Sequence, residues 1–72
     1  MVEAGQLRCW IGGVPDREYM TPAAPGTHFM IVESYKMHPN EAPPRRWTCF
    51  MEGQVKWFYT TEIEKHSEVV SD

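Results

Sequence analysis

Hydrophobic and polar positions alternate over several short stretches of the chain, which is the pattern of half-buried β-strands. Six prolines and five glycines interrupt the sequence so often that no long apolar stripe with helical spacing survives between them. One helical turn is predicted at residues 60–64, with Thr61 as its cap and Glu64 three residues further on. The pattern predicts strands, in chain order, at residues 6–11, 28–37, 47–51, 55–61 and 68–70.

The alternation also divides each strand into two faces. In the first strand Leu7, Cys9 and Ile11 share one face, opposite Arg8 and Trp10. The second strand does not keep one clean phase near its end, which predicts a bulge. The same alternation applies to the last two long strands. If Trp47, Cys49 and Met51 face inward, Thr48 and Phe50 face outward; likewise, if Val55, Trp57 and Tyr59 face inward, Lys56 and Phe58 face outward.

Turn residues mark the connections between these strands. Glu52-Gly53-Gln54 lies between two apolar runs, and Gly53 can supply the positive φ that a tight hairpin needs. Pro25-Gly26 predicts a turn at the entry to the second strand. Residues 12–26 and 37–46, which hold all six prolines, are expected to be loops.

The length of 72 residues allows one domain, with residues 1–4 and 71–72 expected to be loose termini. A chain this short buries a small core and needs large side chains to stabilise it. It carries nine aromatic residues, more than one small core is expected to hide, so some rings should be covered by a partner, by a second copy of the chain or by a ligand. No apolar run approaches the length of a membrane span and the start does not resemble a signal peptide, so we expect a cytoplasmic protein.

Residues suited to catalysis or metal binding are sparse. The sequence contains no glycine-rich phosphate loop and no paired carboxylates, so no enzymatic activity, cofactor or metal site is predicted. The two cysteines, Cys9 and Cys49, are expected to be buried, reduced thiols. His28, His38 and His66 are scattered, and each is expected to lie at the surface or in an ordinary hydrogen bond.

Charge is distributed unevenly along the chain, although the net charge is −3. Residues 36–58 hold four basic and two acidic side chains, whereas the segments on either side are acidic. Aromatic residues concentrate in the same basic third, and rings beside cations suit single-stranded nucleic acid. The candidate nucleic-acid-binding residues are Lys36, Arg45, Arg46, Trp47, Lys56 and Phe58.

The order of elements resembles that of Sm-like and Src-homology-3-like small β-barrels. The resemblance lies in residues 25–33 as the opening of the second strand, in residues 47–59 as the central hairpin, and in residues 60–64 as the turn before the last strand. The run from Gly53 to Glu64 is similar to small barrels encoded by marine phages and sampled in ocean sequence. This resemblance implies an all-β, five-stranded, strongly bent antiparallel barrel that assembles into a homo-oligomer, such as a ring, and binds single-stranded RNA or DNA. The alternative fold is an open sheet with a different strand order. A phage-encoded protein would act in the cytoplasm of its host.

Three uses of the outward rings remain open from the sequence: a nucleic-acid surface, a contact between subunits, or packing against the long loop. The candidate residues for a contact between subunits are Phe50, Phe58, Ile63, Val69 and Val70. The alternative function is a non-enzymatic adaptor that binds a host or phage polypeptide through its aromatic surface and proline-rich loop. The net acidity favours this alternative, and the local cluster of rings and cations favours nucleic acid.

Overall fold

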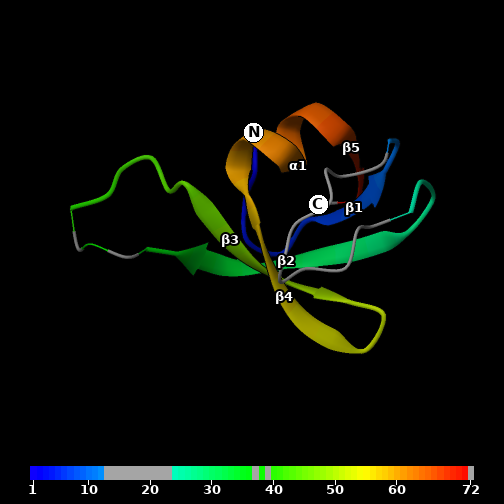
Figure 1. Ribbon diagram of the computed structural model, residues 1–72, viewed down its shortest axis with the longest axis horizontal. Helices are drawn as coiled ribbons and strands as arrows, with labels where there is room; N and C mark the ends of the chain where they lie inside the picture. The colour runs from blue at the N-terminus through cyan, green and yellow to red at the C-terminus, as the bar shows by residue number, and fades with distance from the viewer. Residues whose placement is uncertain (13–23, 37, 39, 72) are drawn as a thin grey trace.

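The computed structural model describes residues 1–12, 24–36, 38 and 40–71. Its elements are β1 (Leu7–Trp10), β2 (His28–Tyr35), β3 (Arg46–Met51), β4 (Gln54–Tyr59), α1 (Thr60–His66) and β5 (Ser67–Ser71). The strands form one antiparallel sheet in the order β4-β3-β2-β1-β5 (Figure 1). The predicted succession of elements along the chain, five strands with one short helix before the last, and the mostly β class are confirmed. Within the described residues, however, β4 and β5 do not pair, and the sheet is not closed into a barrel.

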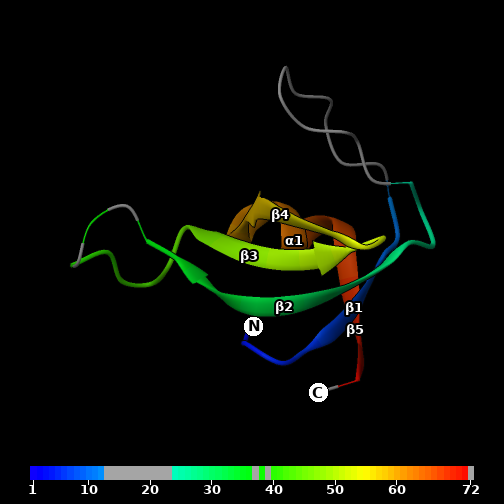
Figure 2. The ribbon, with the colours of Figure 1, turned by 90° about the horizontal axis from the view of Figure 1, so that it is seen from below.

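The sheet is strongly bent because β2 has different partners along its length. Its beginning pairs with β1, from His28 to Met30, and the part from Met30 to Tyr35 pairs with β3. The pairing with β3 is interrupted between Ile31 and Glu33, so the predicted bulge is confirmed, although it lies earlier than the phase of the sequence indicated. Figure 2 shows the result: β5 and β1 run steeply across the direction of β2 and β3.

The core lies on the concave side of this sheet and is rich in aromatic rings. Trp10 stacks on Phe29 with ring centroids 4.3 Å apart, and Phe58 meets Trp10 edge-on at 4.9 Å. Ile63 of α1 is fully buried, so the short helix covers part of the core. Every strand except β5 contributes to the apolar cluster, which consists of Val2, Trp10, Phe29, Ile31, Trp47, Cys49, Met51, Phe58 and Ile63. The expectation that residues 1–4 are loose is therefore wrong for Val2.

A buried arginine joins β1 to β5. Arg8 donates to the Ser67 hydroxyl at 2.9 Å and to the Gln6 side-chain oxygen at 3.0 Å. Burial lowers the pKa of Arg8, against the attraction of Glu64. The inward face of β1 is thus the face of Arg8, and the expectation that Cys9 is buried is wrong: it is half-buried, on the opposite face.

The β3–β4 hairpin has a shorter turn than the sequence pattern suggested. Met51 pairs with Gln54 across a two-residue turn, in which Glu52 and Gly53 have φ of 52° and 77°. The positive φ predicted for Gly53 is confirmed. The turn predicted at Pro25-Gly26 is also confirmed, and Gly26 has a φ of 90° there. Positive φ at both central residues is the geometry of a type I′ turn, the common two-residue connection of a hairpin.

This turn reverses the expected faces of β4. Trp47 lies opposite Phe58, so both side chains enter the core. Val55 lies opposite Phe50, and both point away from the core, with exposed fractions of 70% and 49%. The expectation that Val55, Trp57 and Tyr59 face inward while Phe58 faces outward is wrong, because a shift of one residue in register exchanges the two faces of a strand.

Helix α1 also begins earlier than predicted. Its cap is Tyr59 rather than Thr61, and the backbone N–H of Tyr59 donates to the Glu62 carboxylate at 3.0 Å. This contact satisfies a donor at the start of the helix and fixes the direction in which the chain leaves β4. Most of the predicted loop at residues 12–26 lies outside the described residues.

Candidate functional site

The outer face of the sheet, which is the face turned away from the core, carries two kinds of surface. At one end, Tyr35, Arg46 and Tyr59 lie side by side on β2, β3 and β4. At the other end the corresponding row is apolar, and the paired positions in this apolar row are Met30, Phe50 and Val55. Between the two ends Glu33 lies opposite Thr48, which lies opposite Trp57.

Three rings and one cation form what we call the ring surface: Tyr35, Arg46, Trp57 and Tyr59. Trp57 stands edge-on to Tyr59 at 5.1 Å and to Tyr35 at 6.3 Å. The Arg46 guanidinium lies over Trp57 and over Tyr59, 5.8 and 5.5 Å from the ring centroids. Tyr35 is 42% exposed and is therefore accessible to a ligand. The surface combines π faces with a cation held in a fixed place.

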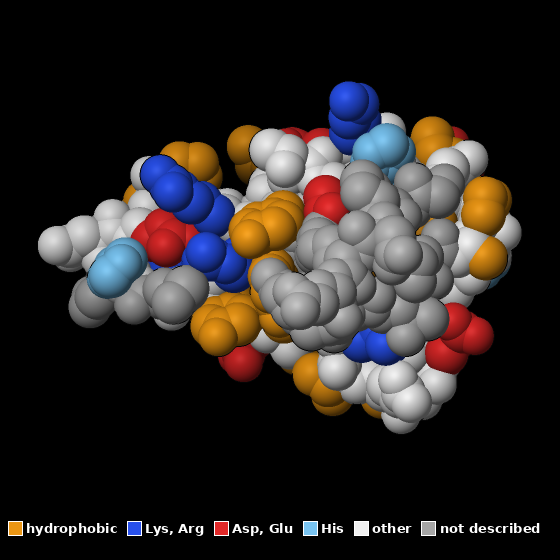
Figure 3. Space-filling view, in the orientation of Figure 1, with side chains coloured by type: hydrophobic (Ala, Val, Ile, Leu, Met, Phe, Trp, Pro, Cys, Tyr) orange, Lys and Arg blue, Asp and Glu red, His pale blue; other side chains and the backbone are white. Residues whose placement is uncertain are grey.

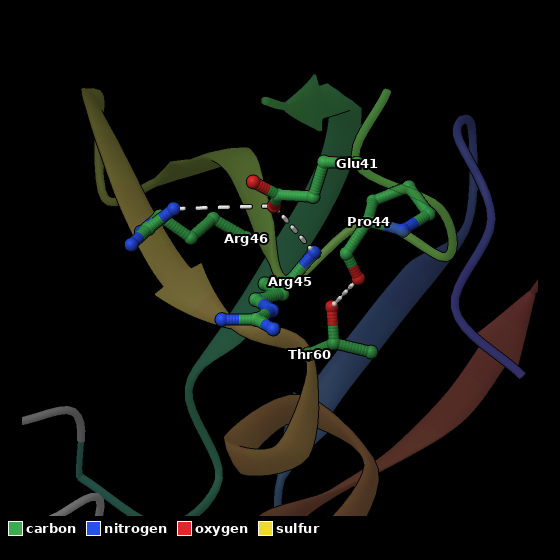
Figure 4. Close-up of polar contacts among 5 residues, drawn as sticks. All are labelled: Glu41, Pro44, Arg45, Arg46 and Thr60. Atoms are coloured by element: carbon green, nitrogen blue, oxygen red, sulfur yellow. Dashed lines mark hydrogen bonds and ion pairs between the residues drawn. The ribbon is translucent and has the colours of Figure 1, made fainter. Parts of the chain in front are cut away.

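The loop before β3 holds Arg45 and Arg46 in position (Figure 4). The Glu41 carboxylate accepts a hydrogen bond from the backbone N–H of Arg45 at 3.1 Å and pairs with the Arg46 guanidinium at 3.9 Å. Thr60, the first residue of α1, donates its hydroxyl to the Pro44 carbonyl at 2.7 Å and its backbone N–H to the Arg45 carbonyl at 2.8 Å. Contacts from Glu41 within the loop and from Thr60 of α1 therefore fix the backbone at Arg45 and Arg46.

A groove of about 770 Å³ lies beside this loop, between it and the start of α1. Its lining mixes carboxylates, cations and a ring: His38, Glu41, Arg45, Tyr59 and Glu64 are among the residues that face it. Figure 3 shows Lys and Arg side chains gathered where the loop projects from the body, next to hydrophobic side chains. Positive charge thus adjoins the ring surface at this end of the molecule.

The apolar row has a different character. Met30, Phe50 and Val55 are all exposed, and Val32 in the bulge is exposed as well. Adjacent exposed apolar side chains on three strands are typical of a surface that another protein or another copy covers. The two ends of the outer face therefore present different chemistry to a partner.

The structure separates the predicted nucleic-acid residues into three groups. Lys36, Arg45 and Arg46 gather at the end of the molecule that carries the ring surface, with Lys36 directly following β2. Lys56 pairs with Cys49 and so lies on the other face of the sheet. Trp47 and Phe58 are core residues, which corrects the expectation that they are available to a ligand.

The predicted residues for a contact between subunits are divided between exposed and buried positions. Phe50 is exposed in the apolar row, and Val69 and Val70 are exposed on β5 at the end of the sheet. Ile63 and Phe58 are buried within this chain, so neither is available for such a contact.

Sequence reasoning missed Tyr35, Trp57 and Tyr59 as candidate binding residues, together with the contacts of Glu41 and Thr60. The period of two placed Trp57 and Tyr59 on one face of their strand, but their assignment to the core hid them. With a two-residue turn in the hairpin, the same period would have placed Trp57 and Tyr59 on the outer face. No comparable sequence signal marks Glu41, because its contacts depend on how the loop folds back onto β3.

Among the residues that the structure describes, the remaining reactive groups do not converge on a site. Burial raises the pKa of the Cys49 thiol to about 12, which makes it unreactive near neutrality. In the part of the chain that the structure describes, no three His, Cys, Asp or Glu side chains are grouped to hold a metal ion. No described helix has the length and apolar character needed to cross a membrane.

Comparison of the chain with protein-family models, with curated protein sequences and with solved structures finds no match.

Proposed function

We propose that this domain binds single-stranded RNA or DNA through the ring surface and the cations beside it. The observation that carries the proposal is the Arg46 guanidinium, held over Trp57 and Tyr59 and next to the exposed ring of Tyr35. Single strands are bound without strong sequence preference by such a combination, because bases stack on rings while cations neutralise phosphates.

The placement of the charges supports this function. Arg45 and Lys36 are exposed and lie close in sequence to the ends of the strands that carry the ring surface. A strand whose bases lie against Tyr35 would have its phosphates within reach of these side chains. The net charge of −3 argues that binding depends on this local arrangement rather than on the charge of the whole protein.

The test is a salt titration of binding to oligouridylate and oligothymidylate of about ten nucleotides, measured by fluorescence anisotropy. If Lys36, Arg45 and Arg46 each neutralise one phosphate, the plot of log K against log salt has a slope of about −2. Absence of binding to either oligonucleotide at low salt, where attraction is least screened, would refute the proposal.

Two variants separate stacking from charge. Tyr35→Ala removes an exposed ring, so affinity should fall by about 1–3 kcal/mol while the salt slope stays unchanged. Arg45→Ala should reduce the steepness of the slope by about 0.7. Lys65→Ala is the matched control, because it removes one exposed cation from α1 instead of from the proposed surface.

Assembly is the second part of the proposal, and it rests on the resemblance to Sm-like and Src-homology-3-like barrels. The element order, with a short helix before the last strand, supports that resemblance. We infer that the chain forms a homo-oligomer through the edge strand β5, with Val69 and Val70, and through Phe50. Light scattering at low micromolar concentration should show an assembly; a mass of 8.4 kDa, that of one chain, would contradict it.

A polypeptide partner is the alternative function, and one observation favours it. Glu33 lies on the outer face and Glu41 lies beside Arg46, so two carboxylates adjoin the ring surface. Carboxylates repel phosphates and attract a basic peptide. Binding of a lysine-rich peptide together with no binding of either oligonucleotide would favour the adaptor function.

A further inference from the structure

Glu41 has an unusual position for an acidic loop residue, because its carboxylate lies against the two arginines of the proposed binding site. One oxygen, Oε1, lies 3.1 Å from the Arg45 backbone nitrogen and 3.9 Å from Nη1 of Arg46. The side chain is only 10% exposed. Figure 4 shows the carboxylate between the Arg46 side chain and the Arg45 backbone.

The two donors that Glu41 engages are those that proteins use for phosphate. Backbone N–H groups and guanidinium groups bind phosphate oxygens in most nucleic-acid complexes, and both bind carboxylate oxygens by the same charge-assisted hydrogen bonds. Arg46 is paired within the sheet, and the Arg45 carbonyl accepts from Thr60. The donors are therefore held by the fold independently of the carboxylate.

The contact of the carboxylate with Arg46 is easily broken. An ion pair with atoms 3.9 Å apart is long for a charge-assisted hydrogen bond, and a glutamate side chain can leave by rotation about its own bonds. The groove of about 770 Å³ adjoins both Glu41 and Arg45, so a phosphate and its sugar have room to approach.

We propose that the Arg45 N–H and the Arg46 guanidinium form a phosphodiester-binding site that the Glu41 carboxylate fills in the free protein and leaves when a single strand binds. This inference rests on the proposed function and adds a specific phosphate position and an internal competitor for it. Glu41 thereby lowers the affinity for nucleic acid and prevents Arg46 from retaining small anions.

The experiment compares oligothymidylate binding by the wild type and by Glu41→Gln at low salt. The amide keeps an oxygen that can accept from the Arg45 N–H but has no charge to compete for Arg46. We expect binding about fivefold tighter, the effect of removing one long, weak ion pair. Glu64→Gln is the matched control, since Glu64 lines the same groove, carries the same charge and contacts neither arginine.

A double-mutant cycle shows whether the gain in affinity from Glu41→Gln depends on Arg46. In an Arg46→Ala background the site lacks its cation, so Glu41→Gln should raise affinity no more than Glu64→Gln does. A gain of equal size with and without Arg46 would overturn the inference, because it would come from charge alone.

An NMR spectrum of the backbone amides gives a measurement on the wild type that needs no variant. In the wild type, the Arg45 N–H signal should shift when the oligonucleotide is added, because its acceptor changes from a carboxylate to a phosphate. If the wild type binds but this signal does not move, or if Glu41→Gln binds no more tightly than Glu64→Gln, the inference fails while the proposed function stands. If neither the wild type nor Glu41→Gln binds, both fail.

Discussion

The two faces of the β3–β4 hairpin differ in what fixes their side chains. On the inner face Trp47, Cys49 and Phe58 are buried, and Phe58 touches the ring of Trp10 from another strand. On the outer face Arg46 and Trp57 contact neighbours of the same sheet, and Phe50 is half exposed. Residues of similar hydrophobicity thus have separate places: the inner rings form the core, and the outer rings lie on the face where we propose that a ligand binds.

The largest expected effect comes from replacing a phenylalanine on the inner face and comparing the loss with that of a phenylalanine on the outer face. Phe58→Ala should lower the free energy of unfolding by about 3–5 kcal/mol, because it leaves a cavity among Trp10 and Phe29. Phe50→Ala, the matched control, should cost less than about 1 kcal/mol when it is measured at a dilution at which the chain is monomeric. Urea denaturation followed by circular dichroism measures both, and equal losses would show that the assignment of faces is wrong.

The free energy of unfolding at alkaline pH reports on the burial of Cys49, which lies on the inner face. The pKa of Cys49 is raised from 9.0 to about 12 in the folded state, so its thiol stays protonated while the unfolded chain ionises. The stabilising contribution is complete below the unfolded pKa and is lost as the pH rises toward the folded pKa.

Between pH 9 and about pH 10.5 this group should therefore lower the free energy of unfolding by about 2 kcal/mol. Urea titrations at several pH values measure the decline. In Cys49→Ala the decline over this interval should be smaller by that amount, and an unchanged pH dependence would contradict the burial of the thiol.

The attachment of the loop to the outer end of the sheet should have a smaller effect. Thr60→Val keeps the shape of the side chain but removes the hydroxyl that donates to the Pro44 carbonyl. Loss of this hydrogen bond should cost about 1 kcal/mol of unfolding free energy. Thr60→Ser, which retains the hydroxyl, should remain within a few tenths of the wild type. A loss in Thr60→Ser as large as in Thr60→Val would assign the effect to the methyl group instead.

The hairpin also shows how far the sequence determines the fold and the site. Alternation located the strands, because half-buried strands produce a period of two in any register. It did not determine which face of β4 is buried: a three-residue turn places Val55 opposite Met51, whereas the actual two-residue turn places Gln54 there. The number of turn residues therefore decided whether Phe58 or Trp57 entered the core.

The candidate site was predictable only in part for the same reason. The clustering of Arg45 and Arg46 near rings is visible in the sequence. The structure places Arg46 over Trp57 and Tyr59, and Arg45 lines the same groove as Tyr59. The burial of Arg8 was not predictable from hydrophobicity, because it depends on acceptors from Gln6 and from Ser67 at the other end of the chain. Contacts between distant segments decide such positions.

The smallest expected effect concerns the turn that sets the two faces. Glu52 has φ of 52°, in the left-handed region that a residue with a Cβ adopts at a cost, and asparagine tolerates this region better than glutamate does. Asn-Gly is also the preferred pair for a type I′ turn. Glu52→Asn should therefore raise the free energy of unfolding by about 0.5 kcal/mol, measured by urea denaturation against the wild type. Gly53→Ala is the opposing control: its added Cβ meets no atom within 4 Å, so any loss of stability comes from backbone strain at φ of 77°. If Glu52→Asn were destabilising and Gly53→Ala neutral, the two-residue turn, and with it the assignment of inner and outer rings, would be wrong.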